Sequence, residues 1–349
     1  MSLNLADCKY KVQNMSFVCM CLVVFIHLTL ADDIRSKFYY SIIRYVFAPI
    51  AVPWFFVLSG LFIAKNVDND SWYKNALQKR FYTLVIPYCI WCALYVLFRC
   101  LLVLIASLVH SRAPTATEFS GFISIESFGL YIFNPPVLVP FWYIRALMLF
   151  IILSPVLLWI IRKFNYIFLI LAFLVYYVVA PPHFYDLDFW IDEKWRSLWR
   201  FGISLEGLLY FSIGMTIGIN KPLRISRLCG HVLGVVGICI GIIGVKSADL
   251  KMFSSIHWHS ISIPLVLYSI WNLIPNVKMP DLWVCNTFGI FTLHFFVKYI
   301  FSVFTQCMSE IGPLYLIAQW VVTVICCIAI AHFTKKIFPA TSRVVFGGR

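Results

Sequence analysis

One histidine lies deep in a strongly apolar stretch of the chain. The stretch FVCMCLVVFIHLTLA covers residues 17–31, and His27 stands near its end. If this stretch crosses a membrane, an ionisable ring within it is costly, and such a ring usually faces a bundle interior or a polar cavity. A positioned imidazole there can accept a proton from a hydroxyl near neutral pH. His27 is therefore a candidate functional residue; the alternative is a structural histidine that hydrogen-bonds a carbonyl of a neighbouring helix.

A basic pair begins another apolar run. Lys79 and Arg80 open KRFYTLVIPY, residues 79–88, and are expected at the inner start of a membrane-spanning helix. Positive charge at a helix start can pair with an anionic ligand, above all a phosphate. The alternative is that both residues only mark topology and extend toward lipid phosphates.

An arginine and two aromatic residues open a further run. Trp142, Tyr143 and Arg145 belong to FWYIRALMLFIILSP, residues 141–155, at the expected outer start of a span. Arg145 lies about one turn inside that span, where an unpaired guanidinium is disfavoured, so we expect it to meet an acid or a polar cavity. Trp142 and Tyr143 fit either an interfacial aromatic belt or a site in which their N–H and O–H groups donate hydrogen bonds.

Two later apolar runs also contain ionisable groups, Glu206 in LEGLLYFSIGMTIG and His294 in GIFTLHFFVKY. Glu206, an acid within an apolar run, is expected to have a polar partner. His294 fits either hydrogen-bonded packing or a functional role.

Cys89 and Cys92 form a C-x-x-C pattern in the middle of an apolar run without further ligands, so we expect buried thiols and no metal site.

These residues need an apolar scaffold, and the composition indicates one. The chain of 349 residues is 62% hydrophobic and only 12% charged, with a mean hydropathy of +0.87, whereas soluble domains are about 45–50% apolar. This excludes a soluble globular protein. We expect an all-α polytopic membrane protein with a single integral-membrane domain over residues 1–349, in which about 16 final residues form a short cytoplasmic tail.

Apolar runs long enough for a membrane-spanning helix recur along the whole chain, and they predict about ten transmembrane helices. The expected spans lie near residues 15–31, 42–63, 82–109, 140–161, 164–180, 201–219, 229–246, 256–274, 284–305 and 313–333.

Lysine and arginine are unevenly distributed between the two sets of loops. With the N terminus inside, the cytoplasmic segments hold about twice as many of them as the opposite loops, as the positive-inside rule requires. Both termini are therefore expected in the cytoplasm. The net charge of +13 then reflects topology and contact with anionic membrane lipids, and the chain lacks the basic and aromatic pattern of a nucleic-acid groove.

Taken in order, these motifs resemble those of an integral-membrane acyltransferase family, often called the acyltransferase-3 family. CMCLVVFIH, residues 19–27, is similar to the end of the family's first helix, and PWFFVLSGLFI is similar to its aromatic-rich second span, with Ser59 and Gly60 as its Ser-Gly pair. KRFYTLVIPY, FWYIRALMLFIILSPVL, YFSIGMTIGINK and FTLHFFV resemble its basic third-span start, its Trp-aromatic-x-Arg-Ala segment, its Gly-spaced sixth span and its late-span histidine. The resemblance covers essentially the whole chain.

The resemblance implies a membrane O-acyltransferase of the bacterial inner cell membrane. Such an enzyme moves an acyl group, with acetyl expected, from cytoplasmic acyl-CoA such as acetyl-CoA to a hydroxyl of a cell-surface or lipid-linked glycan. The site residues expected on this basis are, for catalysis, His27, Glu206, Tyr143 and Arg145, and, for donor binding, Lys79, Arg80, Ser59, Trp142 and His294. His27 is the expected general base, and Asp32 or Glu206 is expected to orient it and to stabilise its charged form.

One position departs from the family pattern. The family's first helix has a basic residue eleven positions before its histidine, whereas this chain has Ser16 there. Lys11 is the nearest basic residue in the sequence. Either another cation replaces the missing one, with Arg80 or Arg44 as the expected replacements, or the activity of this chain is lost or altered.

Two further functions fit the same features. A polysaccharide transporter or export subunit of the same fold would also contain buried ionisable groups in spans interrupted by glycine and proline. However, no repeat between the two halves of the chain is evident, and transport does not need His27. A receptor or assembly subunit without catalysis is the third possibility.

Overall fold

The computed structural model describes residues 8–28, 38–109, 139–179, 204–220, 226–249, 258–306 and 313–348. Every regular element within these residues is a helix, which confirms the predicted all-α class. The α-helices are α1 (Lys9–Ile26), α3 (Phe38–Ile42), α4 (Ala51–Ala64), α5 (Trp72–Arg80), α6 (Ile86–Val109), α9 (Trp142–Phe164), α10 (Tyr166–Val179), α13 (Leu205–Ile219), α14 (Arg227–Asp249), α15 (Trp258–Leu273), α16 (Asp281–Val284), α17 (Thr287–Gln306), α18 (Pro313–Ile337) and α19 (Pro339–Val345).

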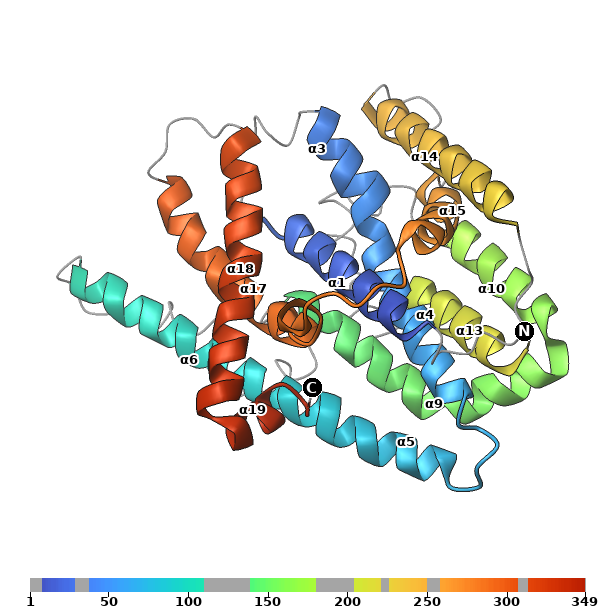
Figure 1. Cartoon of the computed structure of the whole chain (residues 1–349), viewed down its shortest axis with the longest axis horizontal. Coiled ribbons are helices and arrows are strands. Elements are labelled where there is room, and N and C mark those ends of the chain that lie inside the picture. Colours follow the sequence, from blue (N-terminus) through green and yellow to red (C-terminus); the bar gives the residue numbers. More distant parts are fainter. Residues whose placement is uncertain are drawn as a thin grey trace.

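Short irregular turns join some of these helices. Two are π-helical, η1 (Ile43–Phe47) and η3 (Phe81–Val85), and two are 3-10 turns, η2 (Ala48–Ile50) and η4 (Val139–Phe141). The turn η3 links α5 to α6, so that residues 72–108 form one long helical rod (Figure 1).

Within the described residues, 6 helical stretches are long and apolar enough to cross a membrane: Lys9–Ile26, Tyr40–Ala64, Trp72–Leu108, Trp142–Phe164, Leu228–Lys246 and Pro313–Ile337. Shorter apolar helices lie at the remaining expected spans: Tyr166–Tyr177, Leu205–Ile219, Ser260–Leu273 and Thr287–Phe301. The chain is thus a multi-pass membrane protein, while ten crossings and cytoplasmic termini stay predictions.

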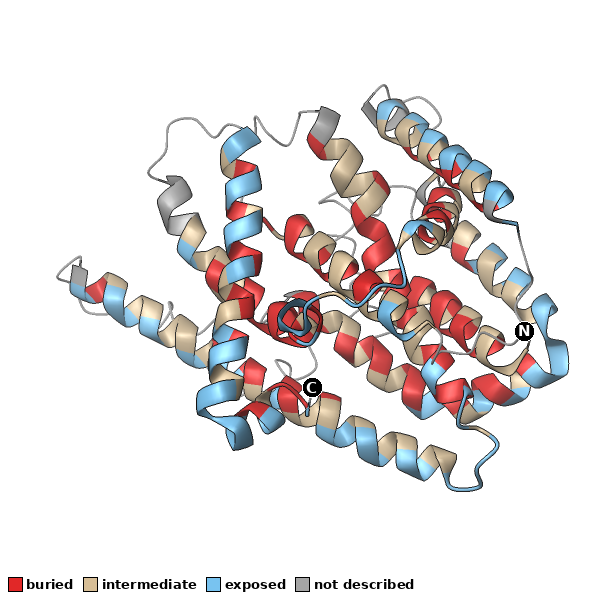
Figure 2. Ribbon diagram, viewed as in Figure 1, coloured by how far each residue is buried: buried red, intermediate tan, exposed pale blue. Residues whose placement is uncertain are grey.

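Large apolar side chains lie exposed on the outside of the bundle. Leu97, Leu108, Ile170 and Val235 expose 64%, 79%, 59% and 61% of their surface. Figure 2 shows buried residues concentrated in α1, α4, α9 and α13, and exposed ones on the outer sides of α14 and α18. Lipid acyl chains rather than water are the solvent that suits such a surface.

Glycines set the packing of α4 against α13 at the centre of the bundle. A Cβ atom added at Gly60 would collide with the backbone carbonyl of Phe211, and one added at Gly214 would collide with that of Val57. The two backbones therefore lie in direct contact, as small residues allow in membrane helix pairs. This contact fixes α4, which forms one wall of the cavity described below.

Long-range hydrogen bonds hold α1 in the middle of the fold. The Asn14 amide Nδ2 donates to the carbonyls of Pro275 and Val277 over 3.0 and 2.9 Å. Trp320 Nε1 in α18 donates to the Cys21 carbonyl over 2.7 Å. The first helix is thereby fixed at both its start and its middle, which places the end that carries His27.

The helix α5 lies along α9. Tyr73 Oη donates to the Ile152 carbonyl over 3.0 Å, and Asp68 pairs with Arg162 at 3.8 Å near the loop that precedes α5. Because the two helices run side by side, Arg80 at the end of α5 reaches the start of α9. The sequence predicted these two helix ends at opposite membrane faces, about 30 Å apart. Because Arg80 lies close enough to Tyr143 for an electrostatic interaction, that placement is wrong.

Candidate active site

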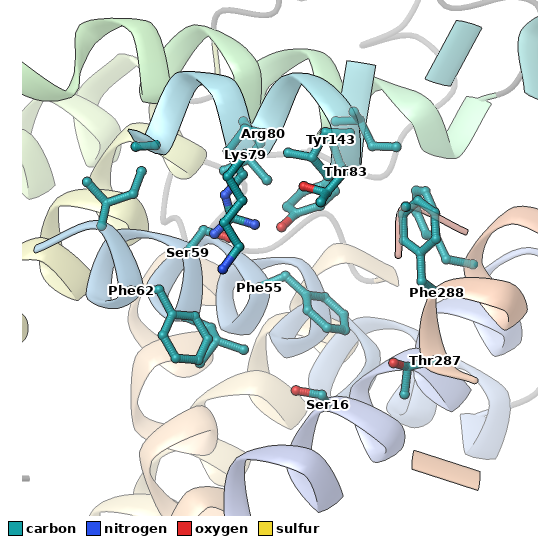
Figure 3. A pocket seen from close by; sticks show the side chains of 18 of the residues that line it. Ser16, Phe55, Ser59, Phe62, Lys79, Arg80, Thr83, Tyr143, Thr287 and Phe288 are labelled. Carbon is teal, nitrogen blue, oxygen red and sulfur yellow. The ribbon is translucent and has the colours of Figure 1, made fainter. Parts of the chain in front are cut away.

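A cavity of about 1070 Å³ lies between α1, α4, α5, α9 and α17. Side chains of η3 and the backbone that follows α19 complete its lining. Figure 3 shows charged, hydroxyl and aromatic side chains converging on it from several helices. The expected site residues that line this cavity are His27, Ser59, Lys79, Arg80, Trp142 and Tyr143, together with Ser16.

One end of the cavity is basic. Lys79 and Arg80 line it at the end of α5, and Lys65 and Asp68 also belong to the cavity lining. In Figure 3 the Lys79 and Arg80 side chains extend from α5 toward Ser59 on α4. Lys79 is exposed and Arg80 is half-buried, so this end, called the basic end below, is the part of the cavity that an anion can reach.

Hydroxyl groups line the middle of the cavity. Ser59, Thr83, Tyr143 and Thr287 contribute them from four different helical elements (Figure 3). The Thr83 Oγ1 atom is buried, and among the described residues it has no hydrogen-bond partner. Such a group is available to a bound ligand, because a buried hydroxyl without a partner is unfavourable.

Aromatic packing fixes Tyr143 in this wall. Its ring lies edge-on to Phe56 at a centroid distance of 4.8 Å and contacts Phe291 at 6.3 Å. Arg80 is close enough for an electrostatic interaction with the Tyr143 hydroxyl. The start of α9 and the end of α5 therefore form one polar surface.

Ser16 lines the cavity but brings no charge to it. Its hydroxyl donates to the Val12 carbonyl over 2.8 Å and accepts from Trp54 Nε1 over 3.1 Å. Of the expected replacements for the missing cation, Arg80 lines the cavity and Arg44 does not. The cation nearest in the sequence, Lys11, instead stacks over Trp271 at 4.8 Å.

The other end of the cavity is formed by His27 and its neighbours. His27 follows α1 directly, and its half-buried ring lines the cavity. The His294 ring of α17 lies 5.4 Å from it, measured between centroids. Phe295 packs edge-on against both imidazoles, at 5.5 Å from His27 and 5.7 Å from His294.

Hydrogen bonds assign the tautomer of His294. Its Nδ1 atom lies 2.7 Å from the Phe291 carbonyl and 3.1 Å from the Ile290 carbonyl. Because carbonyl oxygens only accept, Nδ1 carries the proton, and Nε2 of the neutral ring is an acceptor. Nε2 is buried and has no hydrogen-bond partner among the described residues, so it can accept a hydrogen bond from a group at the His27 end of the cavity.

Two cations stand close to the histidine pair. Arg44 Nη1 donates to the Ile26 carbonyl over 2.6 Å and to Tyr40 Oη over 3.0 Å, next to the end of α1. Lys298 lies one turn beyond His294 and stacks over Phe295 at 4.9 Å. Both contribute positive charge at His27.

Three expected site residues lie outside the cavity lining, Glu206, Arg145 and His294, although the His294 ring lies 5.4 Å from the His27 ring. Glu206 is buried in the first turn of α13, where its carboxylate is near Tyr176 of α10. Arg145 is near Tyr88 and Cys92 of α6. The structure therefore does not bring Glu206 to His27, and Asp32, the other acid expected to orient His27, lies outside the described residues. The catalytic roles expected for Glu206 and Arg145 stay predictions.

Sequence reasoning missed several residues that line the cavity. Phe55, Phe62 and Phe288 form much of its apolar surface, and Thr287 adds a hydroxyl (Figure 3). Gly347 lies near the end of the chain and contributes backbone. Isolated phenylalanines in apolar runs give no signal, but a Gly-Gly pair after a basic segment is a recognisable turn signal.

Together the fold and the site define a multi-pass, all-helical membrane protein with a cavity that joins a basic end to His27, which packs against His294. Residues 10–332 match the sequence model of a family described as an acyltransferase domain, the acyltransferase-3 family. The chain belongs to this family of membrane acyltransferases, which confirms the resemblance of its motifs. Searches of curated proteins and of solved structures found no significant match.

Proposed function

We propose that this protein transfers an acyl group, acetyl by expectation, from cytoplasmic acyl-CoA to a hydroxyl of a cell-surface or lipid-linked glycan. The proposed location is the inner membrane of a bacterial cell. One observation carries the proposal: a single cavity contains both a basic end, at Lys79 and Arg80, and the imidazole of His27. One continuous cavity therefore offers a binding place for a phosphate-bearing acyl donor and a base that can accept a proton.

The donor is proposed to place its phosphates at the basic end. Lys79 and Arg80 offer charge-assisted hydrogen bonds to phosphate oxygens, and Ser59 faces them across the cavity (Figure 3). Trp142 lines the same space. A volume of about 1070 Å³ is at the upper end of ligand sites, which fits a long donor such as acyl-CoA better than a small metabolite.

The reaction is proposed to occur at His27. The imidazole takes the proton of the acceptor hydroxyl as the oxygen attacks the thioester carbonyl. The tetrahedral intermediate then collapses, the carbon–sulfur bond breaks, and the coenzyme A sulfur leaves with a proton from the imidazolium. Tyr143 lines the cavity and can donate a hydrogen bond to the transient oxyanion.

His294 is proposed to support this step. The sequence suggested donor binding for it, but its place beside His27 favours contact with the base or the acceptor hydroxyl. Its Nε2 atom is an acceptor, and it can receive a hydrogen bond from the His27 ring and so fix which nitrogen of His27 is free to act as the base.

Glycan analysis tests the proposal. Surface and lipid-linked glycans are extracted from cells with and without the gene and analysed by mass spectrometry. We expect loss of an acetyl or other acyl mass increment while the amount of glycan stays the same. A lower amount of exported glycan with unchanged acylation would instead support the transporter alternative.

A biochemical assay with labelled acetyl-CoA complements the glycan analysis. Purified protein in lipid nanodiscs is incubated with the labelled donor and with membranes from the deletion strain as acceptor. Label transferred to glycan supports the proposal, and lack of transfer from acetyl-CoA and from longer acyl-CoA donors would contradict it.

A further inference from the structure

The chain turns back onto the bundle after its last long helix. α18 ends at Ile337, and α19 packs against α6. Trp91 Nε1 in α6 donates to the Val345 carbonyl over 3.0 Å, and the ring of Phe346, only 2% exposed, packs against Trp91 at 6.0 Å. This segment lies beyond residues 10–332, which the family model matches.

Glycine ends α19 in a defined geometry. Gly347 has a φ of +63°, its N–H donates to the Val344 carbonyl over 3.4 Å, and the Gly348 N–H donates to the Arg343 carbonyl over 2.6 Å. These two hydrogen bonds form a Schellman motif, which requires a left-handed residue that is usually glycine. The helix therefore stops at Phe346, and the next residues turn toward the cavity.

The backbone at Gly347 lies directly on the turn η3. A Cβ atom added at Gly347 would be 2.5 Å from the Thr83 carbonyl oxygen and 3.1 Å from its Cα atom. Thr83 follows Arg80 by three residues, and η3 is the π-helical turn that continues from Arg80. π-Helical turns often occur at functional sites.

Gly347 and Gly348 also line the cavity together with Lys79, Arg80 and Thr83. We propose that residues 346–348 form part of the donor-binding site, where they close the wall beside the phosphate-bearing part of an acyl-CoA and hold the turn that follows Arg80. This inference rests on the proposed function of the cavity. It assigns a binding role to a segment that the sequence suggested to be a cytoplasmic tail.

The proposal follows from the lack of free space at Gly347. Any side chain there must displace either residues 346–348 or the backbone of Thr83. The first movement opens the cavity wall, and the second shifts the direction of the Arg80 side chain. Both weaken the contact between the basic end and a phosphate, because charge-assisted hydrogen bonds depend on short, aligned geometry.

Donor binding to the full-length protein in lipid nanodiscs tests this, with coenzyme A and acetyl-CoA as the probes in calorimetric titrations. The variants are Gly347→Ala and Gly347→Asn. Asparagine accepts a positive φ at a helix end more readily than alanine does, so it preserves the helix stop while still adding a Cβ atom against Thr83. Val344→Ala is the matched control, because Val344 is 47% exposed on α19 and does not line the cavity.

We expect both Gly347 variants to raise the dissociation constant for coenzyme A on the order of tenfold, as for loss of one good polar contact, and Val344→Ala to leave it within about twofold. The Michaelis constant for the donor should rise while that for the acceptor stays the same. The proposal would be overturned if Gly347→Ala bound coenzyme A with wild-type affinity, or if Gly347→Asn did so while Gly347→Ala did not.

A further variant decides the matter if the Gly347 variants do not fold. Trp91→Phe keeps an aromatic ring against Phe346 but removes the hydrogen bond to Val345, and we expect weaker coenzyme A binding in a folded protein. Unchanged binding in Trp91→Phe would then overturn the proposal. If the wild-type protein binds neither coenzyme A nor acetyl-CoA, the proposed donor itself is wrong, which is a different result from unchanged binding in the variants.

Discussion

The imidazole rings of His27 and His294 lie 5.4 Å apart, centroid to centroid, although one follows α1 and the other belongs to α17. The donor N–H of His294 is engaged with the Phe291 carbonyl, so the nitrogen left to interact at the His27 end is an acceptor. Because His294 offers one defined hydrogen-bond acceptor, it can hold either the His27 ring or the attacking glycan hydroxyl in a single orientation. The site is thus built from both ends of the sequence.

Substitution of His294 tests this pairing. His294→Ala removes the acceptor, and we expect turnover to fall on the order of tenfold, less than the about 10²–10⁴-fold that a general base contributes. His294→Gln retains a polar side chain of similar reach and should recover part of the loss. The measurement is turnover with saturating donor, and His332→Ala, an exposed histidine of α18, is the control. Equal turnover in wild type and His294→Ala would contradict the pairing.

Neutralising the basic end tests donor recognition. We expect Lys79→Met with Arg80→Met to raise the Michaelis constant for acyl-CoA far more than that for the acceptor. Each lost charge-assisted hydrogen bond should cost about 1.5–3 kcal/mol, or roughly ten- to a hundredfold in affinity. Lys74→Met is the control, because Lys74 is exposed on α5 and does not line the cavity. If donor affinity is unchanged, the pair serves only topology.

The serine in place of the family's basic residue gives a gain-of-function test. Ser16 lines the cavity, so Ser16→Arg adds a cation to the donor space, and we expect tighter donor binding by up to about tenfold. The variant also loses the hydrogen bond from Trp54, which should cost about 1 kcal/mol of stability. Ser16→Ala isolates that loss. Unchanged donor affinity in folded Ser16→Arg would mean that Lys79 and Arg80 suffice.

The predicted orientation can be tested with reporter fusions. Fusions at Arg349 should report the cytoplasm, and fusions in the 111–139 loop should report the exterior, because Lys and Arg are concentrated in the inner segments. Both positions lie largely outside the described residues. The opposite pattern would place the basic end away from cytoplasmic acyl-CoA and would contradict the proposed donor route.

The sequence predicted the helices well because hydropathy is a local property. The expected spans 42–63 and 140–161 correspond to Tyr40–Ala64 and Trp142–Phe164. His27 and Arg80 were found for a similar reason, since a charge or an imidazole in an apolar run stands out. Both line the cavity.

The sequence does not show toward which neighbouring helix each side chain points. Glu206 lies on α13, an apolar helix without a polar face to show its orientation, and it turns toward Tyr176 of α10. Likewise, the meeting of Arg80 with Tyr143 depends on α5 lying along α9. That packing is a tertiary contact without a local sequence signal.

Substitution of His27 is the most direct test of the central claim, that His27 is the general base of an acyl transfer. Acyl transfer from labelled acyl-CoA to glycan is measured with purified His27→Ala and His27→Gln, alongside their thermal stability in detergent. We predict that both variants fold with near wild-type stability and lose about 10²–10⁴-fold in turnover. A His27→Gln variant with wild-type turnover would contradict the account, because glutamine keeps a hydrogen-bonding side chain but cannot act as the base.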